Sequence, residues 1–122
     1  DPVFVVDYPA PVCPLAKVSP EDSGVAERFE FFLGGMELAN AFTELNDPER
    51  QLANFEAQAA SSDPEAPREI DRDFVRALAY GMPPAGGLGL GMDRLAMVLL
   101  GCDTIREVLL FPHLRPEGGE GA

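Results

Sequence analysis

Histidine and cysteine are scarce in this sequence, which limits the sites that could be built on them. The two cysteines, Cys13 and Cys102, lie far apart and match neither a zinc-ligand spacing nor a redox pair, so we expect reduced thiols. The single histidine, His113, has no serine or cysteine partner close by in the sequence. We therefore find no nucleophile–base pair and expect His113 to be an ordinary surface or loop residue.

Basic residues are also few, and they are scattered. Nine lysines and arginines stand against 21 aspartates and glutamates, which gives a net charge of −12. Because binding to phosphates of nucleic acid needs clustered basic side chains, this chain by itself is not expected to hold nucleic acid. An acidic protein can still bind ATP when Mg²⁺ and one or two arginines mediate the contact.

Long apolar segments are missing as well. No run approaches the roughly 18 apolar residues of a transmembrane helix, and no basic leader precedes the short apolar run near the N-terminus. These absences predict a cytoplasmic protein without membrane association. The length of 122 residues suits one domain, and a hydrophobic content of 46% is enough for a packed core.

Local sequence signals predict an α+β fold with a mainly antiparallel sheet flanked by helices. Residues 3–8 are β-branched and aromatic, which favours a first strand. Gly34 and Gly35 separate two further strand-like runs, 27–33 and 36–44, and a Gly-Gly pair in this position is typical of a tight β-hairpin.

Helix and loop signals occupy the rest of the chain. Asp47 followed by Pro48 is typical of a helix start, and Asp71 can cap a second helix that runs through Tyr80, with Gly81 as its stop. The remaining predictions are a flexible loop at 61–69, a strand at 87–91, a buried helix at 92–100, a turn capped by Asp103, a buried strand at 108–111 and a flexible tail at 117–122.

Two glutamates of the predicted hairpin are candidates for metal binding. The hairpin register places Glu30 diagonal to Glu37, within joint reach of one ion. Mg²⁺ favours one or two carboxylates together with phosphate oxygens and water, so the pair could hold Mg²⁺ beside a nucleotide. The alternative is that both are solvated carboxylates on the exposed face of a hairpin.

Three residues farther along the second hairpin strand could line a pocket. Asn40, Phe42 and Glu44 share one face by period-two alternation, and they offer an amide, an aromatic ring and a carboxylate. This set suits an amino acid with a cationic side chain. Glu37 has the opposite parity, so we expect a β-bulge near residues 38–39 to bring it to the same face.

The segment GGLGLGMDR, residues 86–94, is rich in glycine but matches neither a dinucleotide-binding motif nor a P-loop. Closely spaced glycines in a strand let another backbone or a flat ligand approach. Arg94 lies in the first turn of the following helix, where the helix dipole favours anions over cations. An arginine there is easier to explain if it faces a bound anion.

Together these motifs resemble the C-terminal part of the catalytic domain of class II lysyl-tRNA synthetases, over residues 1–116. The stretch ERFEFFLGGMELANAFTELNDPERQ resembles the family's metal and lysine sites, and GMPPAGGLGLGMDRLAMVLLG resembles its motif 3. TIREVLLFPHLRP is similar to the family's usual ending. PVCPLAK resembles its Ser-Pro-Leu-Ala-Lys/Arg loop, with Cys13 where serine is more usual.

The resemblance implies ATP-dependent activation of lysine and its transfer to tRNA(Lys). It implies an antiparallel sheet that binds ATP in a bent form, with Mg²⁺ as the metal. By position, the resemblance implies that Glu30 and Glu37 are metal ligands. It implies that Asn40 contacts the lysine carboxylate, Phe42 its methylenes and Glu44 its ε-ammonium. Gly87, Gly89 and Gly91 would line the adenine side, and Arg94 and Glu37 would make catalytic contacts to the nucleotide.

Other parts of that family's pattern are absent from these 122 residues. Motif 1, motif 2 with its arginine, and the anticodon-binding barrel are not found, so we expect a fragment that is inactive alone and belongs to a homodimeric enzyme. Two alternatives stay open. One is a related enzyme that lysylates a protein such as an elongation factor, and the other is a non-catalytic interaction module with the same fold.

Overall fold

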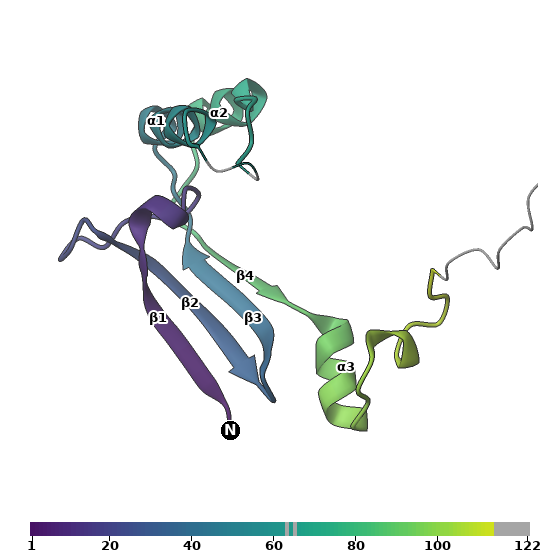
Figure 1. Ribbon diagram of the computed structural model, residues 1–122. Helices are drawn as coiled ribbons and strands as arrows, with labels where there is room; N and C mark the ends of the chain where they lie inside the picture. The colour runs from purple at the N-terminus through teal and green to yellow at the C-terminus, as the bar shows by residue number, and fades with distance from the viewer. Residues whose placement is uncertain (63, 65, 114–122) are drawn as a thin grey trace, which may run out of the picture.

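The computed structural model describes residues 1–62, 64 and 66–113, and its centre is an antiparallel four-stranded sheet in the order β1-β2-β3-β4 (Figure 1). The strands are β1 Val3–Pro9, β2 Val25–Leu33, β3 Met36–Thr43 and β4 Gly86–Leu90. The helices are α1 Pro48–Ala59, α2 Arg72–Ala79 and α3 Met92–Leu100, and the short 3₁₀ turns are η1 Ala10–Val12 and η2 Ile105–Glu107. The predicted α+β fold with an antiparallel sheet is confirmed, whereas the predicted tail at 117–122 lies outside the described residues.

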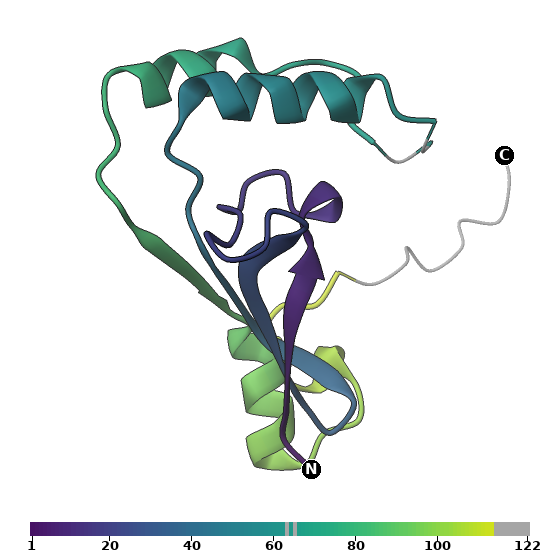
Figure 2. The same cartoon turned by 90° about the vertical axis from the view of Figure 1, so that its left-hand side faces the viewer.

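The helices lie at the ends of the sheet. In both views α1 and α2 run side by side beyond one end of the strands, and α3 follows β4 at the opposite end (Figures 1 and 2). Among the described residues, no helix combines the length and apolar composition that crossing a bilayer requires.

The β2–β3 hairpin forms as predicted. Gly34 and Gly35 have φ values of 62° and 78°, and positive φ at both central residues is the requirement of a type I′ turn. Leu33 pairs with Met36 directly next to this turn.

A β-bulge follows in β3, at the position that the sequence predicted. Phe32 pairs with Glu37 and Phe31 pairs with Ala39, so Leu38 is an extra residue without a partner in β2. The extra residue shifts the alternation of β3 by one position. Glu37 therefore lies on the same face of the sheet as Asn40 and Phe42, the even-numbered residues of β3 after the bulge.

A second irregularity interrupts β1 at Asp7, whose φ of 61° is left-handed. Val6 pairs with Phe29 but Tyr8 pairs with Ala26, so two residues of β2 stand opposite Asp7 alone. Without this shift, regular alternation would point Tyr8 to the other side of the sheet. The irregularity thus places Tyr8 on the face that carries the even-numbered residues of β2.

The pairing register separates the sheet into two faces of different chemistry. We call one the polar face; it carries Tyr8, Arg28, Glu30, Glu37, Asn40, Phe42 and Glu44, with Gly87 and Gly89 opposite. The other, the apolar face, carries Phe4, Val6, Phe29, Phe31, Ala39, Ala41, Leu88 and Leu90. Phe4 packs on Phe31 with ring centroids 4.7 Å apart, yet Phe4 and Leu88 are 62% and 69% exposed. The described elements therefore leave much of the apolar face uncovered.

Both predicted helix starts are confirmed by their capping geometry. The Asp47 carboxylate accepts hydrogen bonds from the backbone N–H groups of Glu49 and Arg50, at 2.9 and 3.1 Å. Asp71 accepts from the backbone N–H of Phe74 at 2.8 Å. Such bonds satisfy N–H groups that have no partner within the helix.

The interior of the α1–α2 pair is only partly buried. Leu78 is buried, but Phe74 is 42% exposed and packs against Phe55 with the two rings tilted by 58° and their centroids 5.9 Å apart. Gly81, the predicted stop of α2, has a φ of 107°, which an L-residue rarely adopts.

Three predictions near the C-terminus are wrong. Residues 108–111 form no strand, because an extended segment needs a neighbouring strand with free backbone groups and none of the described strands pairs with it. Helix α3 has the predicted bounds, but it is not buried: within it only Met97 is buried, and Leu99 is 75% exposed. The cap of η2 is Thr104, not Asp103, because Glu107 closes a reciprocal capping box with Thr104.

Candidate functional site

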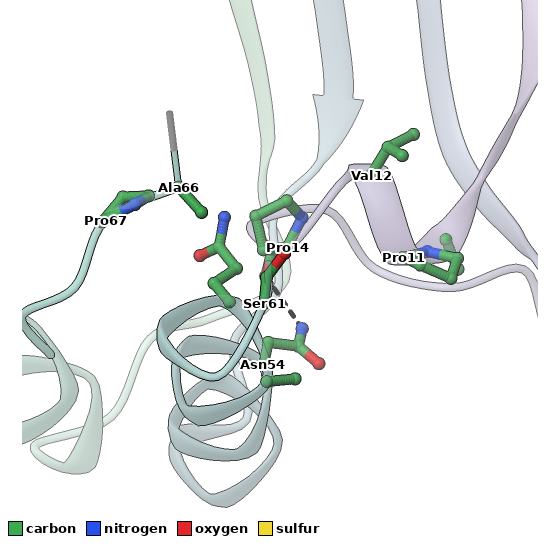
Figure 3. Close-up of a pocket in the computed structure, with 10 residues that line it drawn as sticks. Pro11, Val12, Pro14, Asn54, Ser61, Ala66 and Pro67 are labelled. Carbon is green, nitrogen blue, oxygen red and sulfur yellow. Dashed lines mark hydrogen bonds between the residues drawn. The ribbon is translucent and has the colours of Figure 1, made fainter. Parts of the chain in front are cut away.

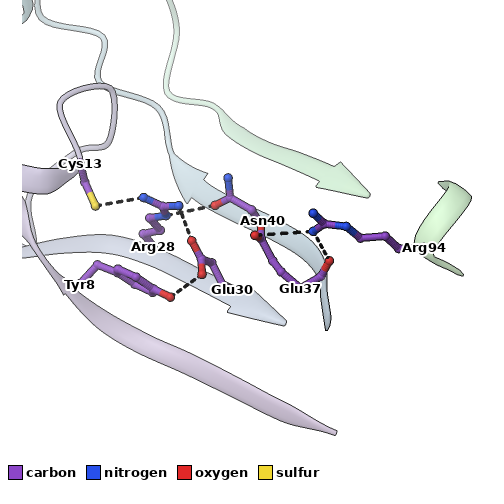
Figure 4. A network of polar contacts seen from close by, with 7 residues as sticks. All are labelled: Tyr8, Cys13, Arg28, Glu30, Glu37, Asn40 and Arg94. Atoms are coloured by element: carbon purple, nitrogen blue, oxygen red, sulfur yellow. Dashed lines mark hydrogen bonds and ion pairs between the residues drawn. The ribbon is translucent and has the colours of Figure 1, made fainter. Parts of the chain in front are cut away.

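Arg28 is the centre of a hydrogen-bonded network on the polar face (Figure 4). Its Nε donates to Asn40 Oδ1 at 3.1 Å, and its Nη2 forms a short ion pair with Glu30 Oε1. Its Nη1 donates to Cys13 Sγ at 3.4 Å, and the guanidinium lies 4.8 Å from the centre of the Tyr8 ring. One planar cation therefore fixes side chains from β1, β2, β3 and the loop after η1.

Tyr8 and Glu30 form the second strong contact of this network. The Tyr8 hydroxyl donates to Glu30 Oε2 at 2.6 Å. This hydrogen bond, together with desolvation and the charge of Glu30, raises the pKa of Tyr8 to about 12. Partial burial lowers the pKa of Arg28, but its hydrogen bond to Cys13 and the charge of Glu30 outweigh that effect and raise it above its ordinary value.

Glu37 and Arg94 lie together at the far end of the polar face. Arg94 Nη1 donates to the Glu37 carbonyl oxygen at 2.6 Å and lies 3.8 Å from Glu37 Oε2. Both residues line a hollow of about 380 Å³, whose wall also includes Asn40, Gly89 and Gly91. The structure thus brings together five residues that sequence analysis predicted for the nucleotide and lysine sites.

Glu44 lies at the other end of the same face, over β4. Phe42 pairs with Gly87, and the side chain of Glu44, two residues farther along the chain and just beyond the end of β3, reaches diagonally across to the Cα of Gly87. Within residues 1–62, 64 and 66–113, the Glu44 carboxylate has neither a hydrogen bond nor an ion pair. A half-buried carboxylate without a partner, beside an aromatic ring, is suited to receive a cation.

The donor chemistry of Glu30 and Glu37 fits a hard cation. Each Glu30 oxygen accepts one hydrogen bond, from Arg28 or Tyr8, and a carboxylate oxygen can accept a second contact. Among the described residues, no three His, Cys, Asp or Glu side chains converge to hold a metal by themselves. The pair therefore fits Mg²⁺ shared with phosphate oxygens better than a metal enclosed by protein.

Arg28, Tyr8 and Ile105 also belong to the site, although they were not predicted from the sequence. Arg28 shares the parity of Glu30 in β2, and this i, i+2 spacing was a usable signal. Tyr8 reaches the polar face only because of the irregularity at Asp7, and no local sequence motif predicted that irregularity. Ile105 lines the hollow beside Arg94 from η2, an element distant in sequence from the hairpin.

The loop that presents Cys13 is tied to α1 rather than to the sheet alone. Gln51, which is 1% exposed, and Asn54 both donate to the Pro14 carbonyl oxygen, at 3.1 and 2.8 Å. Figure 3 shows the contact between Asn54 and Pro14 beside a second hollow of about 530 Å³, lined by Pro11 and Val12 among others. This hollow contains none of the predicted site residues.

Comparison with known proteins identifies the family to which this chain belongs. A family model described as tRNA synthetases class II (D, K and N) matches residues 1–115. The lysine–tRNA ligase of Xanthomonas oryzae pv. oryzae (strain MAFF 311018) is 53% identical over 118 residues, which cover 95% of this chain and 23% of the relative. Those of Burkholderia multivorans and Burkholderia pseudomallei are 54% and 55% identical over 119 residues, 96% of this chain and 23% of each relative. The chain thus spans about a quarter of the length of these curated relatives, and it belongs to the class II tRNA synthetases of the D, K and N group.

Proposed function

We propose that these residues are the C-terminal part of the catalytic domain of a lysine–tRNA ligase. The observation that carries this proposal is the Glu44 carboxylate, which has no partner among the described residues and lies on the same face as Phe42 and the hollow lined by Glu37 and Arg94. The similarity to lysine–tRNA ligases supports lysine as the substrate. We use the term "full-length protein" for the longer polypeptide in which residues 1–116 form the C-terminal part of the catalytic domain.

The lysine side of the site uses three alternate residues, two in β3 and one just beyond its end. Glu44 pairs with the ε-ammonium group of the substrate, and Phe42 packs on its methylenes. Asn40, whose amide is oriented by Arg28, contacts the carboxylate end. Selection against neutral amino acids follows because a neutral side chain would leave the Glu44 carboxylate desolvated and unpaired.

The nucleotide side uses the other end of the polar face. Arg94 and Glu37 contact ATP, with Gly89 and Gly91 allowing the flat adenine to approach the backbone. Glu30 and Glu37 would hold Mg²⁺, and the bound ion would neutralise charge on the phosphates of ATP. Arg94 keeps donor groups free for a phosphate because only Nη1 is used in the contacts described.

Catalysis in this proposal depends on positioning and electrostatics. The lysine carboxylate attacks the α-phosphorus of ATP, pyrophosphate leaves, and a lysyl-adenylate forms. The lysyl group then passes from this adenylate to tRNA(Lys), and AMP leaves. Side chains of the polar face orient the two substrates and balance their charges without themselves forming a covalent bond to either substrate. Because this chain has a net charge of −12, most of the tRNA-binding surface lies elsewhere in the full-length protein.

The proposal also covers the localisation and oligomeric state of the enzyme and the activity of this chain alone. The full-length protein is a cytoplasmic homodimer, and the 122-residue chain by itself does not activate lysine. The coverage of the relatives supports the second statement alone, since this chain corresponds to only 23% of their length.

A calorimetric titration of lysine into the full-length protein tests the role of Glu44. We expect Glu44→Gln to weaken lysine binding roughly thirtyfold or more, because it removes one partner of a desolvated charge pair. Binding of norleucine, which lacks the ε-ammonium group of lysine, should change far less. Glu56→Gln, on the exposed surface of α1, is the matched control and should leave lysine affinity unchanged. Equal lysine affinity in wild type and Glu44→Gln would contradict the proposal.

A further inference from the structure

We infer that Gly87 is a specificity-determining position of the lysine pocket, because the absence of a side chain there makes room for the Glu44 carboxylate. This inference rests on the proposed function. It changes the role that resemblance implied, since Gly87 would then serve the lysine side instead of the adenine side.

The Glu44 carboxylate closely approaches β4. A Cβ added at Gly87 would overlap Glu44 Oε1 and lie 3.2 Å from Glu44 Cδ. Gly87 pairs with Phe42, and both therefore face the polar side of the sheet. The hydrogen on the Gly87 Cα is thus what allows the carboxylate to lie directly over the strand.

The other glycines of β4 do not share this property. A Cβ at Gly86 would lie 3.9 Å from the Phe42 carbonyl oxygen, and one at Gly89 would lie 3.8 Å from the Asn40 carbonyl oxygen. Both are ordinary van der Waals distances. None of the three has a positive φ, so alanine could adopt the backbone conformation at each position.

Gly87→Ala should therefore act on one flexible group. The overlapping atom belongs to the end of a long side chain, which can rotate away at little cost, whereas the ladder of β3 and β4 does not have to move. The carboxylate would leave the position from which it faces the substrate ammonium. A lysine that keeps its other contacts would then bind without its charge partner.

The test is lysine-dependent ATP–pyrophosphate exchange by the full-length protein. We expect Gly87→Ala to raise the KM for lysine roughly tenfold while the KM for ATP changes less than about twofold. Gly86→Ala, the matched control on the opposite face, should change neither constant. In a Glu44→Asp background, Gly87→Ala should have a smaller effect, because the shorter carboxylate reaches less far over β4.

Two outcomes would overturn the inference. An unchanged KM for lysine in Gly87→Ala would show that Glu44 does not need this space. A rise confined to the KM for ATP would return Gly87 to the adenine side. In both cases the wild-type protein still exchanges pyrophosphate with lysine, whereas absence of exchange in the wild type would reject the proposed function itself.

Discussion

The Arg28 guanidinium lies between the Glu30 carboxylate and the Asn40 amide, which belong to different strands. Without a cation at this point, the Glu30 carboxylate would face an unbalanced negative environment that includes Glu37. The planar fork of arginine also fixes the direction of the Asn40 amide, which a lysine could not do in the same way. Arg28 is thus a positioning residue for the two groups that we assign to the metal and to lysine.

Tyr8 provides a prediction at the same scale. Its hydrogen bond to Glu30 raises the phenol pKa from 10.0 to about 12, so the stabilisation from this bond is complete below pH 10 and is lost as the pH rises through about 12. In a spectrophotometric titration of the chain, we expect one phenolate step near pH 12. Tyr8→Phe should remove that step, and Glu30→Gln should move it toward 10.

The titration has a clear contradictory result. If no phenolate step near pH 12 disappears in Tyr8→Phe, the hydrogen bond between Tyr8 and Glu30 does not persist in solution. The second tyrosine, Tyr80, is 88% exposed and stays in both variants, so the difference between their curves reports Tyr8 alone.

Two strand irregularities, rather than regular strands, shape the site at the scale of elements. The bulge at Leu38 brings Glu37 to the polar face, and the shift at Asp7 does the same for Tyr8. Each changes the alternation of one strand by a single residue, which exchanges the two faces for everything beyond it. The site would lose a carboxylate or a phenol if either strand were regular.

The left-handed conformation of Asp7 leads to a testable prediction about the stability of β1. A β-branched residue is disfavoured in the left-handed conformation by about 1–2 kcal/mol, so Asp7→Val should lower the free energy of unfolding by that amount in urea. Asp7→Gly, which adopts positive φ freely, is the control and should cause no loss. Equal stability of the valine and glycine variants would show that the left-handed turn at Asp7 is not retained.

Elements whose signals are local were predictable from the sequence. The Gly34-Gly35 turn, the bulge at Leu38 and the Asp47 cap each depend on a few adjacent residues, and all are present. The apolar segment 108–111 was predicted as a strand from the same kind of signal, but strand formation also requires a partner. Arg28 was missed for a related reason, since three of its four contacts, to Tyr8, Cys13 and Asn40, come from residues distant in the chain.

The uncovered apolar face dominates the properties of the whole molecule. Phe4, Val6 and Leu88 expose more than half of their surface there, and β1 is an edge strand whose outer side pairs with no other described strand. Contiguous apolar surface of this kind and a free sheet edge both favour association. The isolated 122-residue chain should therefore self-associate, with a mass that rises with concentration.

Light scattering at increasing concentration measures this association. We expect Leu88→Gln to lower the average mass, because it places an amide in the middle of the apolar face, whereas Glu56→Gln on α1 should leave the mass unchanged. A monodisperse monomer at high concentration would contradict the prediction.

The most direct test of the account is lysine-dependent ATP–pyrophosphate exchange, measured on the full-length protein and on this 122-residue chain. The account predicts exchange by the full-length protein with lysine, and none by the chain alone. If the full-length protein shows no lysine-dependent exchange, the polar face is not an activation site, and an interaction module with the same fold becomes the better explanation.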